Sequence, residues 1–147
     1  MKRSVLHAAV SVAAFFSVSP AFAQTPSKPV TIESYYRIKW GSAEEFKDLY
    51  RRNHQPILQE LQKQGLITGM RVDAPFTHMA GGPRWDLRVT ITYRDAPSAV
   101  EVGGSYDKAA DAVTARLYPD KKRLETDEAR RFSLLEDHWD VVVTPAD

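Results

Sequence analysis

Alternation of apolar and polar side chains predicts four β-strands. It is clearest near the start of the chain, where Ile32, Tyr36 and Trp40 fall on one predicted face and Glu33 and Arg37 on the other. The same period of two, with β-branched and aromatic residues, recurs further along. The predicted strands are residues 30–40, 66–74, 85–93 and 138–144.

Apolar side chains three and four residues apart predict helices between the strands. The longest spans residues 42–65, beginning at a capping box of Ser42 and Glu45 and ending at Gly65. Pro56 removes a backbone donor within it, so we expect a kink. Further helices are expected at residues 96–102, 105–118 and 120–134, and the charged first half of the last one predicts a solvated face.

The predicted order is β-α-β-β-α-(α)-β, which is the α+β, ferredoxin-like arrangement. It places one antiparallel four-stranded sheet under helices on one face and leaves the other face uncovered. Two interpretations of that open face compete: it meets water, or it pairs with a second sheet and buries matched ion pairs. Its expected side chains are Glu33, Tyr35, Arg37, Lys39, Asp86, Arg88, His138 and Asp140.

The N-terminal segment has the pattern of a cleavable secretory signal. Lys2 and Arg3 precede a run of about 14 mostly apolar residues, and Ala21-Phe22-Ala23 supplies a small-residue cleavage site. The run is shorter than the roughly 20 residues that span a bilayer. A buried N-terminal helix is the alternative, but nothing amphipathic marks the segment.

Cleavage after Ala23 predicts a periplasmic or secreted protein. We expect residues 1–23 to be the signal peptide, 24–29 a flexible leader with two prolines, and 30–147 a single domain. The mature form is then expected to carry no membrane anchor.

The net charge and the lack of cysteine argue against several classes of function. Without residues 1–23, the chain has 18 basic and 19 acidic side chains, a net charge of −1 that offers no basic excess for nucleic acid. The chain has no cysteine, which excludes disulfides, thiol catalysis and thiolate metal sites. We expect no cofactor and no nucleic-acid partner.

The region between residues 35 and 67 resembles the dimeric α/β-barrel superfamily, which includes NIPSNAP-like, EthD-like and antibiotic-biosynthesis-monooxygenase-like proteins. The resemblance implies that two sheets close into a barrel across a two-fold axis, and therefore a homodimer. It also implies a ligand between the helices and the sheet of one subunit. The resemblance rests on Tyr35-Tyr36-Arg37-Ile38-Lys39-Trp40-Gly41, Glu45-Phe46, Tyr50, His54-Gln55-Pro56, Leu61 and Gly65-Leu66-Ile67.

Large aromatic side chains are expected on the helix-facing side of the sheet, including all three tryptophans. They form either a packed core or the walls of a pocket for a flat organic molecule. Asn53 and His54 add polar groups at or beside the apolar stripe of the first helix, and they are the candidate catalytic residues. The candidate ligand-binding residues are Tyr36, Trp40, Asn53, His54, Trp85 and Trp139.

Each polar candidate has a structural alternative. A buried Asn53 amide without partners would cost about 1–3 kcal/mol, but it could satisfy a backbone group near Pro56. His54 could act as a general base near neutral pH or be merely structural. His78 lies in a loop that is either a lid or an ordinary hairpin connection.

A metal site is not expected. Glu136, His138 and Asp140 alternate along the last strand, but successive side chains on one face are about 7 Å apart, too far to share one ion without help. Ion pairs with Arg37, Arg71 or Arg88 explain these residues better.

The sequence predicts an exported homodimer that binds a small apolar or aromatic molecule between sheet and helices, with or without cofactor-free chemistry. The main alternative is a non-enzymatic, stress-associated or structural module without a pocket. Haem binding through His54, His78 or His138 is a weaker alternative. The sequence does not decide whether the protein is an enzyme.

Overall fold

The computed structural model describes residues 28–77 and 79–144, which contain one antiparallel four-stranded sheet. The strand order is β2-β3-β1-β4, so β1 is central and pairs with both β3 and β4. The predicted α+β, ferredoxin-like architecture is therefore confirmed. The predicted signal peptide and most of the predicted leader lie outside the described residues. The strands are β1 (Val30–Ile38), β2 (Ile67–Asp73), β3 (Leu87–Tyr93) and β4 (Leu135–Val143).

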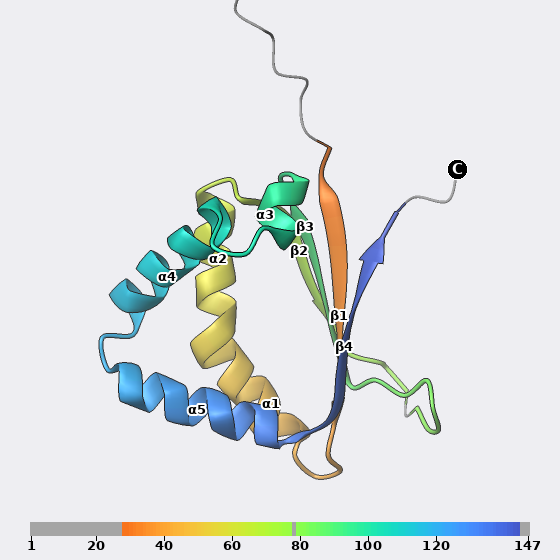
Figure 1. Cartoon of the computed structure of the whole chain (residues 1–147). Helices are drawn as coiled ribbons and strands as arrows, with labels where there is room; N and C mark the ends of the chain where they lie inside the picture. Colours follow the sequence, from red (N-terminus) through yellow and green to blue (C-terminus); the bar gives the residue numbers. More distant parts are fainter. Residues whose placement is uncertain (1–27, 78, 145–147) are drawn as a thin grey trace, which may run out of the picture.

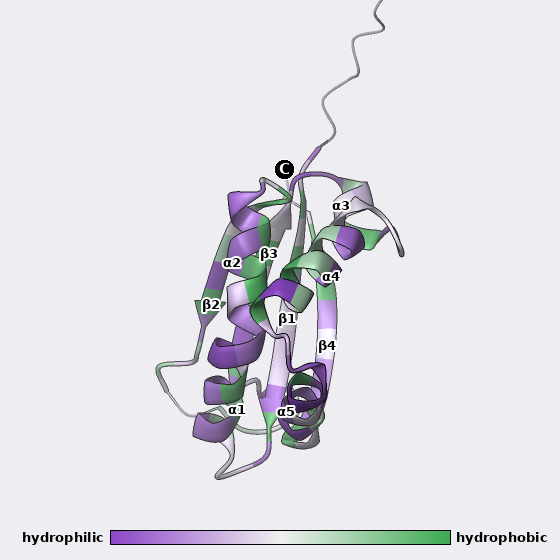
Figure 2. Ribbon diagram, turned by 90° about the vertical axis from the view of Figure 1, so that its left-hand side faces the viewer, coloured by the Kyte–Doolittle hydropathy of each residue, from purple (hydrophilic) through white to green (hydrophobic). Residues whose placement is uncertain are grey.

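The helices lie together on one face of the sheet (Figures 1 and 2), as the element order predicts. Coloured by hydropathy, α5 is one of the most hydrophilic elements in Figure 2, in keeping with its predicted solvated face. No helix in the described ranges is both long and apolar enough to cross a membrane. The helical elements are α1 (Ala43–Leu49), the π-helical η1 (Tyr50–His54), α2 (Gln55–Lys63), α3 (Ala96–Val100), α4 (Ser105–Leu117) and α5 (Lys121–Ser133).

The predicted kink at Pro56 takes the form of a π-helical turn. Pro56 has no backbone N–H, and the N–H of Gln55 donates to the carbonyl of Tyr50, five residues back. The wider turn inserts one residue into the helical repeat between α1 and α2. It therefore sets which way Tyr50 and His54 point.

Helix α1 begins where the capping-box pattern predicts, but the capping interaction itself is absent. Ser42 occupies the N-cap position without a side-chain hydrogen bond to the helix. Glu45 pairs with Arg130 of α5, with its Oε1 2.7 Å from Arg130 Nε. This carboxylate joins α1 to α5 on the surface instead of capping α1.

The hydrophobic core fills the space between the sheet and α1, η1 and α2. Phe46 and Leu61 of the helices meet Ile38, Ile67 and Val89 of the sheet, and all five are almost fully buried. Burial of side chains of this size contributes roughly 1.5–3 kcal/mol each.

The open face of the sheet is held by ion pairs within one chain. Arg88 lies 3.0 Å from Asp73 on β2 and 3.6 Å from Glu33 on β1. Tyr35 donates to Glu33 at 2.5 Å, and Arg37 lies 3.8 Å from Asp137. The predicted mixture of opposite charges on this face is therefore present and already paired within the sheet.

The predicted orientation of β4 is wrong. Tyr35 pairs with Trp139 and Tyr36 with His138, so Trp139 faces the open side and His138 faces the helices. The prediction placed the most apolar side chains of this strand toward the core. In the structure those side chains, Trp139, Val141 and Val143, lie on the open face of an edge strand.

Candidate functional site

Five aromatic and basic side chains meet between the sheet and the helices: Tyr36 of β1, His138 of β4, Tyr50 and His54 of η1, and Arg131 of α5. We call them the inner cluster. The rings of Tyr36 and His138 have centroids 4.4 Å apart, and those of Tyr50 and His54 lie 5.3 Å apart. Tyr36 and Tyr50 join the two pairs at 6.3 Å. Four elements, β1, η1, α5 and β4, therefore build one polar patch inside an apolar layer.

Arg131 is the charged centre of the inner cluster. Its side chain is only 3% exposed, and its Nη2 lies 2.5 Å from Glu128 Oε2. Its guanidinium also lies over the rings of Phe132 and Phe46, at 4.5 and 5.6 Å from their centroids. Its Nη1 is buried and has no hydrogen-bond partner in the described part of the chain. One nitrogen of this buried cation is therefore left without a hydrogen-bond partner among the described residues.

Tyr50 carries a second free donor. Its hydroxyl is buried and also lacks a partner among residues 28–77 and 79–144. Burial raises the pKa of Tyr50 above its ordinary value, so the phenol stays protonated at neutral pH. An unpaired buried polar group costs about 1–3 kcal/mol.

His54 is neutral in the folded protein at neutral pH. Burial, reinforced by the positive charge of Arg131, lowers the pKa of His54 to about 4. Burial also raises the pKa of Tyr36, so this phenol is protonated as well. At neutral pH the inner cluster therefore presents the uncharged side chains of Tyr36, Tyr50 and His54 around the permanent cation of Arg131.

The inner cluster reaches the surface at the junction of α5 and β4. Phe132 is half exposed, and its ring lies 6.5 Å from that of His138. His138 itself is partly exposed. A molecule could therefore approach the cluster over Phe132 and His138.

The six predicted ligand-binding residues do not form one site. Tyr36 and His54 belong to the inner cluster, but the other four lie in three other places. Their roles in binding stay predictions, and the expectation that all three tryptophans face the helices is wrong.

Asn53 is buried, as its place on the helical stripe predicts, but it does not satisfy the backbone near Pro56. Its Nδ2 donates to Asp127 Oδ2 at 3.1 Å, and Arg52 reaches the same oxygen at 3.0 Å. These bonds, with that of Asn53 the largest cause, lower the pKa of Asp127. Asn53 lines a separate groove of about 230 Å³ at the turn between α4 and α5.

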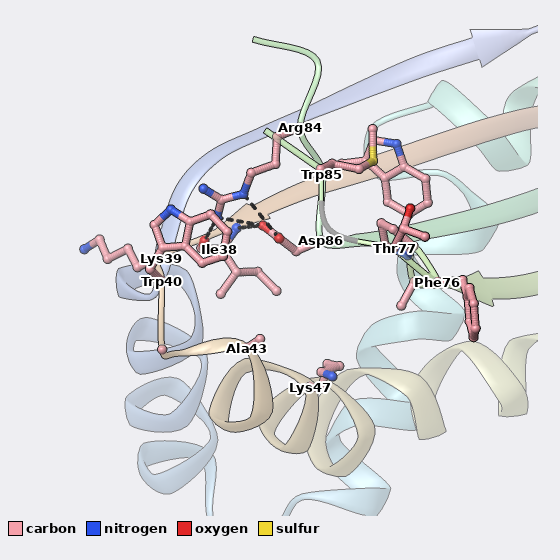
Figure 3. Close-up of a pocket in the computed structure, with 14 residues that line it drawn as sticks. Ile38, Lys39, Trp40, Ala43, Lys47, Phe76, Thr77, Arg84, Trp85 and Asp86 are labelled. Atoms are coloured by element: carbon pink, nitrogen blue, oxygen red, sulfur yellow. Dashed lines mark hydrogen bonds and ion pairs between the residues drawn. The ribbon is translucent and has the colours of Figure 1, made fainter. Parts of the chain in front are cut away.

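Trp40 and Trp85 line a second groove at the end of the sheet (Figure 3), with a volume of about 310 Å³. Trp40 follows β1 and is largely exposed, with its indole 4.2 Å from the guanidinium carbon of Arg84. Trp85 precedes β3, so the alternation of that strand does not fix its direction. Its ring meets the edge of Tyr35 at 5.9 Å.

Trp139 lies on the open face, stacked on Tyr35 with ring centroids 5.3 Å apart and planes within 4°. Strand β4 has a bulge between its pairings with Arg37 and Ile38, and Glu136 is the extra residue. Glu136 points to Arg84, with Oε2 3.3 Å from Nη1.

The acidic and histidine residues of β4 do not form a ligand set for a metal. His138 and Asp140 face the helices beside Tyr36 and Ser34, whereas Glu136 pairs with Arg84. No group of three His, Asp or Glu side chains suited to a metal ion occurs within the described residues. The side chain of His78 lies outside them.

Sequence reasoning missed Arg131, Tyr50 and the inward direction of His138. Arg131 stands seven residues after Leu124 and three before Leu134, on the inner stripe of α5. That spacing was the available signal, since a charged residue on an apolar stripe is rarely left unpaired.

Comparison with known proteins supports the fold. No protein-family model and no curated protein matches the chain. An EthD family protein from Bacillus halodurans matches 80% of this chain and 99% of its own, with 14% identity and a TM-score of 0.50. A NIPSNAP family protein from Agrobacterium tumefaciens matches 82% of this chain and 89% of its own, with 21% identity and a TM-score of 0.49.

A dimeric ferredoxin-like protein from Thermobifida fusca is a more distant likeness. It matches 81% of this chain and 92% of its own, with 15% identity and a TM-score of 0.44. The similar structures are of the kinds that the sequence resemblance indicates. At 14% identity, the Bacillus halodurans protein supports the ferredoxin-like fold alone and leaves the function open.

The lowered pKa of His54 predicts a pH-dependent stability. Below about pH 6.5 the unfolded chain binds a proton at His54 that the folded protein excludes until about pH 4. The free energy of unfolding should therefore fall as the pH drops through this window, by about 2–3 kcal/mol from this group. Urea unfolding of wild type and His54→Gln at several pH values measures it.

His54→Gln should lose this part of the pH dependence, whereas the control His138→Gln should keep it. Carboxylates that titrate in the same range are common to all three proteins and cancel in the comparison. Identical pH profiles for wild type and His54→Gln would show that His54 is not desolvated.

Proposed function

We propose that the protein is an exported homodimer that binds a small molecule at the inner cluster, between the sheet and the helices of each subunit. The observation that carries the proposal is the pair of buried, unpartnered donors, Tyr50 Oη and Arg131 Nη1. The ligand would have an oxygen acceptor for these donors and an apolar or aromatic body.

The free donors argue for a ligand because buried polar groups are nearly always hydrogen-bonded. Arg131 already has Glu128 as its counter-charge, so the ligand need not be an anion to balance it. Carbonyl, hydroxyl or ether oxygens of a ligand would satisfy these two donors. The neutral imidazole of His54, beside Tyr50, would add an acceptor or donor.

The same groups favour binding over acid–base catalysis. A general base works best with a pKa near the operating pH, and the pKa of His54 is about 4. Tyr36 and Tyr50 have raised pKa values and hold their protons. We therefore infer that these side chains recognise the ligand, and any chemistry would depend on the ligand's own reactivity.

The body of the ligand would lie against the aromatic rings at the surface end of the cluster. Phe132 and His138 meet there edge to face, and Tyr36 lies directly beneath His138. Flat rings pack well against such surfaces, in offset or edge-to-face contact.

The homodimer is proposed to form through the open face of the sheet. Trp139, Val141 and Val143 form an apolar stripe on the edge strand β4, and the two valines are about 40% exposed. On the same face but across β1, Arg88 Nε and Thr90 Oγ1 of β3 have no partner within the described part of the chain. A second sheet would cover the stripe and could satisfy these two atoms.

Export is proposed from the sequence of residues 1–23 alone, with its basic start, apolar run and Ala21-Phe22-Ala23 end. It implies that both the ligand and the dimer belong to the periplasm or the exterior. The near-zero net charge of the mature chain fits a small-molecule partner better than a nucleic acid.

Removing the free donors should weaken binding without weakening the fold. Tyr50→Phe deletes a hydroxyl that makes no hydrogen bond, so the free energy of unfolding should change by less than about 1 kcal/mol. Arg131→Met removes one member of an ion pair, but its partner Glu128 is partly exposed and can be solvated by water, which limits the loss of stability, so the variant is expected to stay folded. A thermal-shift screen of small aromatic carbonyl compounds should find molecules that raise the Tm of wild type and not of Arg131→Met.

Two results would contradict the inner cluster as a binding site. One is a loss of several kcal/mol of stability in Tyr50→Phe, which would mean that its hydroxyl has a structural partner. The other is a set of compounds that stabilise wild type and Arg131→Met equally. A screen in which no compound stabilises the wild type would favour the alternative of a module without a pocket.

Adjacent residues of β4 test the dimer. Val141→Asp places a charge on the open face, whereas Val142→Asp places the same charge on the opposite side of the strand at a more exposed position. Sedimentation velocity should show a dimer for wild type and Val142→Asp and a monomer for Val141→Asp. A monomeric wild type, or dissociation by Val142→Asp alone, would refute the proposed interface.

A further inference from the structure

The groove at the end of the sheet shares no residue with the inner cluster. It opens between the last residues of β1, the helix α1 and the segment that joins β2 to β3. Figure 3 shows Ile38 and Asp86 on one side, Ala43 and Lys47 of α1 on the other, and Phe76 near one end. Its volume of about 310 Å³ is at the small end of the range for ligand sites.

A buried arginine makes one wall of the groove rigid. Arg84 donates to Asp86 and Glu136 at 3.0–3.3 Å and to the carbonyl of Ile38. Asp86 in turn accepts the N–H of Ile38 at 2.7 Å. Trp40 lies over the guanidinium of Arg84, which holds this large exposed indole in place. The wall is therefore formed before any ligand arrives.

Lys47 is the charged group of the groove that remains available. Arg84 and Asp86 neutralise each other, and Lys39 donates to the carbonyl of Ser133 and points away in Figure 3. Among the residues that the structure describes, Lys47 pairs only with Glu44, three residues earlier on the same helix, whose side chain is 80% exposed. Such a surface pair contributes little, so Lys47 can turn to a ligand at small cost.

The other walls are apolar and aromatic. Phe76 is fully exposed and Trp40 largely so, and Met79 and Trp85 continue the lining between them. Large aromatic side chains that are exposed to solvent beside a groove are typical of binding surfaces. They can enclose a flat apolar body but offer it few hydrogen bonds.

We propose that this groove is a second binding site, for small organic anions with an aromatic body. The acidic group of the ligand pairs with Lys47, and its aromatic body lies along the apolar lining that runs from the indole of Trp40 toward Phe76. The site is independent of the inner cluster and of the function proposed for it.

Two fluorescent probes that share their rings and differ in charge test this site. Anilinonaphthalene sulfonate carries an anionic group, and phenylnaphthylamine has the same rings without it. Lys47→Met should weaken binding of the sulfonate by roughly tenfold, as expected for a charge-assisted hydrogen bond, and leave the uncharged probe unaffected. Lys63→Met is the matched control, because Lys63 pairs with Glu60 in the same three-residue spacing on α2 and lies outside the groove.

Phe76→Ala tests the apolar wall. Because Phe76 is fully exposed, its removal should leave the fold intact and weaken both probes alike. Arg131→Met should change the affinity for neither probe, which separates this site from the inner cluster.

The proposal is overturned if Lys47→Met and Lys63→Met affect the sulfonate equally, or if Phe76→Ala leaves both affinities unchanged. It is also overturned if Arg131→Met abolishes binding of the sulfonate, since the probe would then occupy the inner cluster. If the thermal-shift screen finds no ligand for the inner cluster, the probe-binding results for this groove are unaffected.

Discussion

The register of β1 against its two neighbours determines which side chains reach each face of the sheet. β1 pairs with β3 on one side and with β4 on the other, and each neighbour runs antiparallel to it. Because Tyr36 points to the helices, its partner His138 must do so too, and Trp139 must face the open side. A shift of one residue would exchange these faces and move the apolar stripe of β4 into the core.

This register gives the protein two unlike surfaces. Toward the helices it brings His138 beside Tyr36, where η1 and α5 add Tyr50, His54 and Arg131. Burying these groups without full hydrogen bonding is costly, and an all-apolar core would avoid that cost. Toward the open side it brings paired charges and an apolar stripe, the mixture expected of a protein interface. The proposed binding site and the proposed dimer thus follow from one pairing pattern.

Much of this fold follows from local sequence patterns, but the site depends on features that such patterns do not encode. The alternation in β1 and the burial of Asn53 were predicted correctly, and the irregularity expected near Pro56 is present as a π-helical turn, because each depends on a residue's own element. The direction of Trp139 was not, because the apolar side of an edge strand can face either layer and only the register with β1 decides. Trp85 lies just before its strand, where alternation no longer applies. Arg131 was hidden in a charged helix whose inner stripe becomes evident only when α5 is placed against η1.

The central proposal is that Tyr50 Oη and Arg131 Nη1 have no hydrogen-bond partner among the described residues because both donate to a bound ligand. A high-resolution crystal structure tests this most directly, if the protein is purified under conditions that retain any ligand bound during expression. We predict a bound organic molecule with oxygen atoms about 3 Å from Tyr50 Oη and Arg131 Nη1 and a flat body against Phe132 and His138. A structure in which both donors bond to protein groups within a closed aromatic core would contradict it.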